Sequence, residues 1–188
     1  MMFAVLAEDP SDAEVLVVLI RRISGDANRP IHRKGFGGCG ELRRKAGRQI
    51  VNFARQGATH FVICHDSDGD DPADIRRSVT ASLRGQITLT EHRHKIVVPV
   101  QELEAWMIAD EQAISAVIPS LLTAEVKHPE SLENPKEWLI NSSRKGRSRP
   151  LYVPHVFNEK VAGYLNIDKA GKKCPSFLEL VGFVRESA

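Results

Sequence analysis

The chain has few of the features that mark a specialised class of protein. Its 188 residues include three cysteines, which are widely spaced and outside any CxxC pair, so neither a disulfide framework nor a structural zinc site is expected. No apolar run is long enough to cross a membrane, and no basic stretch precedes an apolar one at the N-terminus. We therefore expect a protein of the reducing cytoplasm with no membrane partner.

The composition is otherwise ordinary. Hydrophobic residues make up 42% of the chain and charged residues 27%, as in soluble globular proteins. The net charge of +2 is unevenly distributed: residues 136–188 hold ten Lys or Arg and five Asp or Glu, which leaves residues 1–135 with a net charge of −3. A basic end after an acidic first part favours a polyanionic partner.

Up to residue 110, short apolar runs alternate with stretches whose apolar residues recur at helical spacing. This alternation predicts an α/β fold with a largely parallel sheet over residues 1–110. The pattern then changes, and residues 111–188 predict a mainly helical C-terminal extension, either packed on the same core or separate. Strands are expected at 2–7, 29–33, from 60 and at 95–100, and helices at 13–23, 41–55, 72–83, 111–122, 135–142, 156–165 and 175–186.

The strongest signal is a short apolar run that leads into a group of acids. Phe61–Cys64 predicts a buried strand, and Asp66, Asp68 and Asp70 follow it directly. In an α/β sheet, ligands bind outside the carboxyl ends of parallel strands. A polar turn that caps the next helix would explain Asp71 before Pro72, but it leaves the three earlier acids unexplained.

Two other expected strands also end in acids. Glu8 follows the first apolar run, and Glu102 and Glu104 follow the fourth. On a strand continued to residue 104 these last two would share a face, whereas on a helix they would diverge by about 200°. Parallel strands bring their carboxyl ends to one edge, so we expect one composite acidic site of the kind that suits Mg²⁺ or Mn²⁺. The candidate metal ligands are Glu8, Asp12, Asp66, Asp68, Asp70 and Glu104.

Basic residues late in the chain are candidates for holding the phosphates of a nucleic acid. The alternative is a solvated surface, in which case the basic helix with Arg43, Arg44 and Arg48 would take that role. The glycine run 35–40 lacks the GxxxxGK[ST] pattern of a phosphate loop and favours a flexible active-site loop. The nucleic-acid candidates are Arg144, Lys145, Arg147, Arg149, Lys169, Lys172 and Lys173.

The acids resemble those of the Toprim fold, which topoisomerases, DnaG-type primases, recombination mediators and OLD-type (overcoming lysogenisation defect) nucleases share. The Toprim pattern is a glutamate after the first strand and an Asp-x-Asp after a later one, matched here by Glu8 and by Asp66 with Asp68. The OLD-type variant adds an acid four positions after the glutamate, matched by Asp12. Asp9 departs from that variant, which commonly has glycine there.

Two further stretches, residues 102–110 and 174–177, are similar to a group of small bacterial Toprim-like proteins. The resemblance implies a Mg²⁺- or Mn²⁺-dependent nuclease, with Glu8, Asp66 and Asp68 as catalytic residues and DNA rather than RNA as the partner. It also implies work beside an ATPase partner in defence against phage or plasmids. No tyrosine follows the motifs as a topoisomerase nucleophile would.

Other functions stay open at this point. A Toprim-like protein without catalysis would serve as a binding or regulatory module. A response-regulator receiver domain would explain Glu8, Asp9 and Asp66, but the late strand ends in Gln101 and Glu102 instead of the lysine that a receiver needs. A haloacid-dehalogenase-type phosphatase carries its DxD motif after the first strand, whereas this chain has it after the third.

Overall fold

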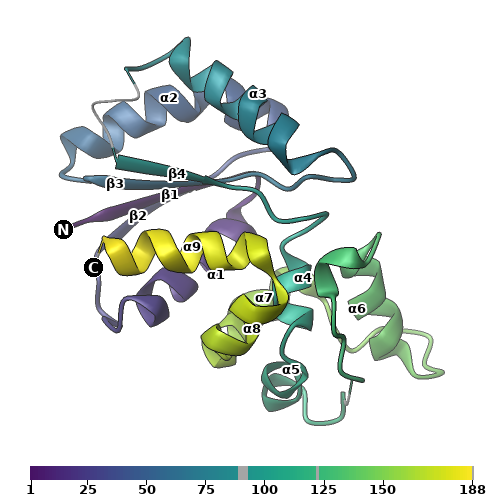
Figure 1. The fold of residues 1–188 in the computed structure, drawn as a ribbon. Helices are drawn as coiled ribbons and strands as arrows, with labels where there is room; N and C mark the ends of the chain where they lie inside the picture. Colours follow the sequence, from purple (N-terminus) through teal and green to yellow (C-terminus); the bar gives the residue numbers. More distant parts are fainter. Residues whose placement is uncertain (89–92, 122, 188) are drawn as a thin grey trace.

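The computed structural model describes residues 1–88, 93–121 and 123–187 and has an α/β architecture (Figure 1). Its four strands form one sheet in the order β2-β1-β3-β4, and all neighbours are parallel. The fold class expected from the sequence is confirmed, with helices on both faces and a helical C-terminal region. The strands are β1 Phe3–Ala7, β2 Ile31–Gly35, β3 His60–Cys64 and β4 Arg93–Val97.

The helices cover the two faces of the sheet. Figure 1 shows α2 and α3 on one face and α1 and α9 on the other, with the remaining helices gathered beyond the carboxyl ends of the strands. They are α1 Pro10–Ile23, α2 Cys39–Arg55, α3 Pro72–Arg84, α4 Glu104–Ile108, α5 Glu111–Val117, the 3-10 turn η2 Pro129–Ser131, α6 Pro135–Arg144, α7 Pro154–Tyr164, α8 Ile167–Lys173 and α9 Pro175–Glu186.

The central strands are buried on both faces because helices pack against each. All five residues of β1 are buried, as expected for a parallel sheet between two helical layers. Successive side chains point to opposite faces: Phe3, Val5 and Ala7 join the core under α1 and α9, while Ala4 and Leu6 join the core under α2 and α3.

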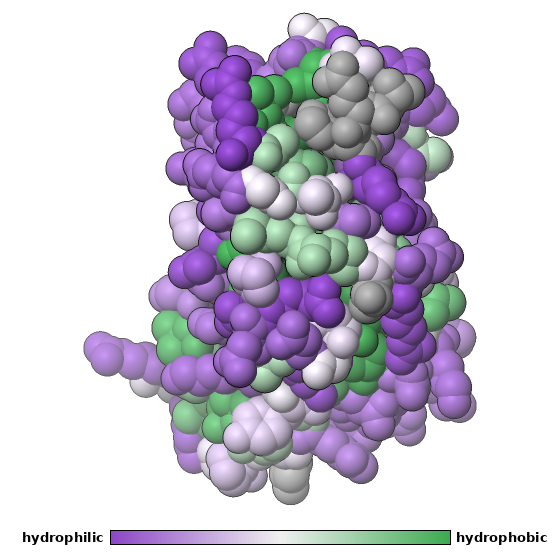
Figure 2. Space-filling model, turned by 90° about the vertical axis from the view of Figure 1, so that its left-hand side faces the viewer, coloured by the Kyte–Doolittle hydropathy of each residue, from purple (hydrophilic) through white to green (hydrophobic). Residues whose placement is uncertain are grey.

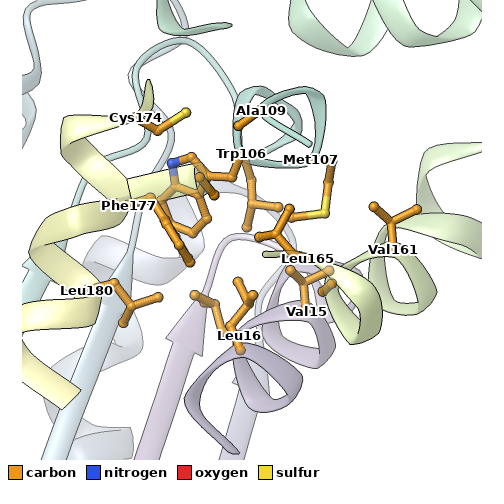
Figure 3. Packing of buried hydrophobic residues seen from close by; sticks show 14 of the residues in the cluster. Val15, Leu16, Trp106, Met107, Ala109, Val161, Leu165, Cys174, Phe177 and Leu180 are labelled. Carbon is orange, nitrogen blue, oxygen red and sulfur yellow. The ribbon is translucent and has the colours of Figure 1, made fainter. Parts of the chain in front are cut away.

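The C-terminal helices pack on the core of the α/β part. Trp106 of α4 lies with its ring centroid 5.2 Å from that of Phe177 in α9, and its indole N–H donates to Ser176 Oγ at 2.8 Å. Figure 3 shows both rings beside Leu16 of α1 and Leu165. One apolar cluster therefore includes side chains from residues 1–110 and from residues 111–187.

Some boundaries expected from the sequence were wrong. The second strand lies at Ile31–Gly35, because Pro30 has no N–H to donate to a ladder. The fourth strand begins earlier than expected and ends at Val97, two residues before Pro99. The helix α8 was not expected, and α5 ends at Val117; residue 122, the expected end of that helix, lies outside the described residues.

One face of the molecule is largely polar. Figure 2 shows hydrophilic residues over most of one face, with hydrophobic residues in smaller areas between them. Within residues 1–88, 93–121 and 123–187, no helix is long and apolar enough to cross a membrane.

Candidate acidic site

The candidate site lies where the chain changes direction in the sheet. From β1 the chain crosses to β2 on one side, and β3 pairs on the other side, so α1 and α2 leave on opposite faces. Such a topological switch point opens a crevice at the carboxyl ends of the strands. Glu8 follows β1 and Asp66 follows β3 at this point, and the backbone N–H of Asp66 donates to Glu8 Oε1 at 2.9 Å.

A buried histidine lies beside Glu8. His65, which is 3% exposed, has its Nδ1 2.8 Å from Glu8 Oε1 and its Nε2 2.9 Å from Nη2 of Arg43 in α2. A guanidinium only donates hydrogen bonds, so Nε2 accepts and Nδ1 carries the ring proton. The Nδ1 proton is donated to the carbonyl oxygen of Asp66 at 2.6 Å, and the ring lies beside the carboxylate of Glu8.

Asp12 lies in the first turn of α1, close to other acids. Asp9 caps this helix, because its carboxylate accepts from the backbone N–H of Asp12 at 3.0 Å and from Ser11 Oγ at 2.7 Å. Burial, with the charges of Asp9, Glu104 and Glu8, raises the pKa of Asp12 from 3.8 to about 8. An acid near a helix N-terminus normally gains from the helix dipole, so burial and the neighbouring charges outweigh the dipole here.

Asp66 lies at the centre of the acidic group. Burial and the charges of Asp12, Glu104, Glu8 and Asp68 raise the pKa of Asp66 well above its usual range. The pKa of Asp68 is also raised, by burial and then by Glu8 and Glu102. In this environment the ionised form of a carboxylate is unfavourable unless a cation lies close to it.

The last acid of the group comes from α4. Glu104 is 3% exposed, and its Oε1 accepts from Nδ2 of Asn158 at 3.0 Å. The Oδ1 atom of Asn158 accepts from the hydroxyl of Tyr152 at 2.7 Å, and both partners are buried. Burial raises the pKa of Glu104. Residues 152–158 of the C-terminal region thus position an acid of the α/β part.

The sequence analysis missed a lysine that lies among these acids. Lys136 Nζ is 3.6 Å from Glu102 Oε1 and 3.9 Å from Glu104 Oε1. Although burial lowers the pKa of Lys136, the charges of Glu104, Glu102, Asp66 and Asp12 raise it above its ordinary value. The sequence did contain a signal for this lysine: a positive charge in the first turn of an expected helix opposes the helix dipole and therefore suggests a nearby acid.

Glu102 and Glu104 both approach Lys136, but they lie neither on one continued strand nor on one helix, the two arrangements considered from the sequence. The strand does not reach residue 104, and only Glu104 is in a helix. Gln101 turns the chain with a left-handed φ of 63°. Glu102 then accepts from the backbone N–H of Lys136 at 2.9 Å, at the start of α6.

Other expected site residues lie elsewhere. Asp70 is exposed, and its backbone N–H donates to the carbonyl of Ser67, so no described contact joins it to the acidic group. The side chain of Lys173 is 14% exposed and pairs with Glu125 at 2.9 Å, and Lys169 pairs with two acids. The remaining basic candidates are exposed: Arg144, Lys145, Arg147, Arg149 and Lys172.

Two clefts open onto the acidic group. One, of about 440 Å³, is lined by Asp12, Glu104 and Lys136 together with residues 153–155. The other, of about 380 Å³, is lined by Asp68 and Glu102 with Gly69, Gln101, Glu133 and Asn134. Since Lys136 contacts Glu102 and Glu104, its side chain lies between the acids of the two clefts.

Comparison with known proteins gives one assignment. Residues 7–185 match the family model "Domain of unknown function (DUF4276)". The chain belongs to this family. No curated protein and no solved structure matches it. The matched range takes in all of the acids described above, as well as the C-terminal helices that position Glu104.

The candidate ligands of this protein are of the chemical type that binds a hard divalent cation. All the candidate ligands are carboxylates, and oxygen donors of this type bind Mg²⁺ and Mn²⁺. In the part of the chain that the structure describes, however, no three His, Cys, Asp or Glu side chains are grouped so that they could hold an ion. Lys136 supplies positive charge at this point.

Proposed function

We propose that this protein is a nuclease that cleaves phosphodiester bonds, in DNA rather than RNA, with Mg²⁺ or Mn²⁺ held by Glu8, Asp66 and Asp68. Asp12 and Glu104 would complete the site for a second ion. The observation that carries the proposal is the group of acids from three chain segments at the switch point, which raise one another's pKa values. The Toprim and OLD-type resemblance of the same residues supports it.

A bound ion supplies Lewis-acid stabilisation of the charge on a phosphate. The protein's own part begins with Glu8. Its Oε1 accepts from Asp66 N and lies beside the Nδ1 of His65, while no hydrogen bond or ion pair from a described residue reaches Oε2. Oε2 is therefore the atom that would either bind the ion or, in the alternative role of Glu8 as general base, accept a proton from the attacking water. The hydrogen bond from the backbone N–H of Asp66 keeps the carboxylate in that orientation.

The substrate would extend from the acidic site along α6. Lys136 lies at the start of this helix and Arg144 at its end. Eight residues at 1.5 Å each separate them by about 12 Å. The exposed side chains of Arg144, Lys145, Arg147 and Arg149 would then contact phosphates a few nucleotides from the cleaved bond.

The proposed setting is the cytoplasm, because Cys39, Cys64 and Cys174 are all free thiols. An ATPase is the protein partner that the resemblance implies. Cleavage is therefore to be measured for the protein alone and together with an ATPase encoded beside it. A Toprim-like binding module is the alternative.

The test is cleavage of plasmid, linear duplex DNA and RNA with Mg²⁺, Mn²⁺ or EDTA. Asp66→Ala and Glu8→Ala should abolish metal-dependent cleavage and keep the fold. Glu159→Gln, an exposed acid on α7, is the control and should keep full activity. Undiminished cleavage by Asp66→Ala would refute the assignment. No cleavage under any condition would leave the binding module as the better account.

A further inference from the structure

A large net positive charge lies in a segment that supplies none of the acids of the site. Residues 29–55 hold eight Lys or Arg and one acid, a net charge of +7, whereas the whole chain carries +2. The rest of the chain is therefore net negative, at −5. This segment consists of the edge strand β2, the glycine-containing turn and α2.

The arginines of α2 form one stripe. Arg44, Arg48 and Arg55 are exposed, and at 100° per residue their side chains fall within an arc of about 40°. From residue 44 to residue 55 the helix rises about 16 Å. Phosphates follow each other every 3.4 Å along the axis of one strand of a DNA duplex, so the stripe matches the length of about five of them.

These arginines are not neutralised within the molecule. Two other basic side chains nearby have acidic partners: Arg33 pairs with Glu14, and Lys45 pairs with Glu41. Across residues 1–88, 93–121 and 123–187, no acid lies within ion-pair distance of Arg44, Arg48 or Arg55. Three unpaired guanidiniums on one face repel one another, and a polyanion relieves that repulsion.

The stripe leads away from the acidic site. At the start of α2, the backbone N–H of Gly38 donates to the carbonyl of Glu8 at 2.9 Å. Arg43, one residue before the stripe, donates to His65 beside the same glutamate. A polyanion on the stripe would therefore have one end close to Glu8 and Asp66.

We propose that the α2 stripe of Arg44, Arg48 and Arg55 binds the phosphate backbone of a DNA duplex that enters the acidic site. The inference rests on the proposed function for the nature of the ligand. It adds a second contact surface, on the α/β part, to the loop at residues 144–149. Contacts of this kind are independent of base sequence and fix the position of the duplex.

Binding of fluorescently labelled 20-base-pair duplexes of unrelated sequence, measured by anisotropy in EDTA between 50 and 200 mM salt, tests the proposal without cleavage. For Arg44→Ser with Arg48→Ser, we expect the slope of log K against log salt to fall by about 1.8. The affinity ratio of wild type to variant should then shrink about tenfold across this range. Arg44→Lys with Arg48→Lys should keep the wild-type slope, because charge alone is required.

The matched control is Lys127→Ser with Lys160→Ser, which removes the same charge from two exposed positions elsewhere. It should leave the slope unchanged. Equal slopes for the arginine variant and wild type would overturn the proposal, as would binding to vesicles of anionic lipid without binding to duplex. Duplex binding through α2 without cleavage in Mg²⁺ or Mn²⁺ would support this inference and refute only the proposed chemistry.

Discussion

Replacing Asp12 by asparagine should stabilise the metal-free protein, and more strongly as the pH rises. The pKa of Asp12 is about 8 in the folded protein, because of burial and neighbouring acids, against an ordinary value of 3.8. Between these values the folded state keeps a proton that the unfolded chain has lost. The free energy of unfolding therefore falls from about pH 4 to pH 8 and is level above it. Asparagine is neutral throughout and removes this loss.

The size of the effect follows from the two pKa values. A gap of about four pH units corresponds to at most ~5.5 kcal/mol at 1.36 kcal/mol per unit. Lys136 and solvent in the cleft screen Asp12, and Asp66 shares the titration, so we expect about 2 kcal/mol at pH 8. For a chain of 188 residues this is a rise in Tm of about 4–8 °C.

The assay is thermal unfolding in EDTA at pH 5, 6.5 and 8 for the wild type, Asp12→Asn and the control Glu159→Gln. The rise in Tm for Asp12→Asn relative to wild type should be small at pH 5 and largest at pH 8. The control should change Tm by less than about 2 °C at every pH. A gain that does not depend on pH, or no gain at pH 8, would show that Asp12 is not held among like charges.

Three other substitutions test the local structure around the site and in α7. Asn158→Leu leaves the buried carboxylate of Glu104 without its donor and should lower the urea unfolding free energy by about 2–3 kcal/mol; an unchanged midpoint would mean that this hydrogen bond is dispensable. Gly35→Ala places a Cβ 2.2 Å from the backbone nitrogen of Pro10 and should cost more than about 2 kcal/mol. Gly163→Ala in α7 meets nothing within 4 Å and should instead stabilise by about 0.5–1 kcal/mol.

The sequence predicted those parts of the structure whose signals are local. The apolar run before Asp66 predicted β3, and the proline with helical periodicity after Cys174 predicted α9 with its observed bounds. Glu8 and Asp66 could be placed at one edge because parallel strands share it. These inferences need only the period of a strand or helix and the direction of the sheet.

The parts that were missed depend on contacts between distant segments. Lys136 is 32 positions from Glu104, and no periodicity links them, although a lysine in the first turn of a helix was a detectable anomaly. His65 was passed over as part of a strand end, yet its two ring nitrogens lie beside Glu8 and beside α2. Asp70 follows the same alternation as Asp66 and Asp68, but the turn after Ser67 leaves it exposed.

The packing of Trp106 against α9 has a consequence for how this protein unfolds. The helix that carries Trp106 begins with Glu104, so the same five residues belong to the acidic site and to the core shared with Phe177. Amide hydrogens of α4 and α9 should therefore exchange with similar protection, as members of one cooperative unit. A chain that loses α9 to proteolysis exposes Trp106, frees Glu104 from its place and loses the site together with the helix.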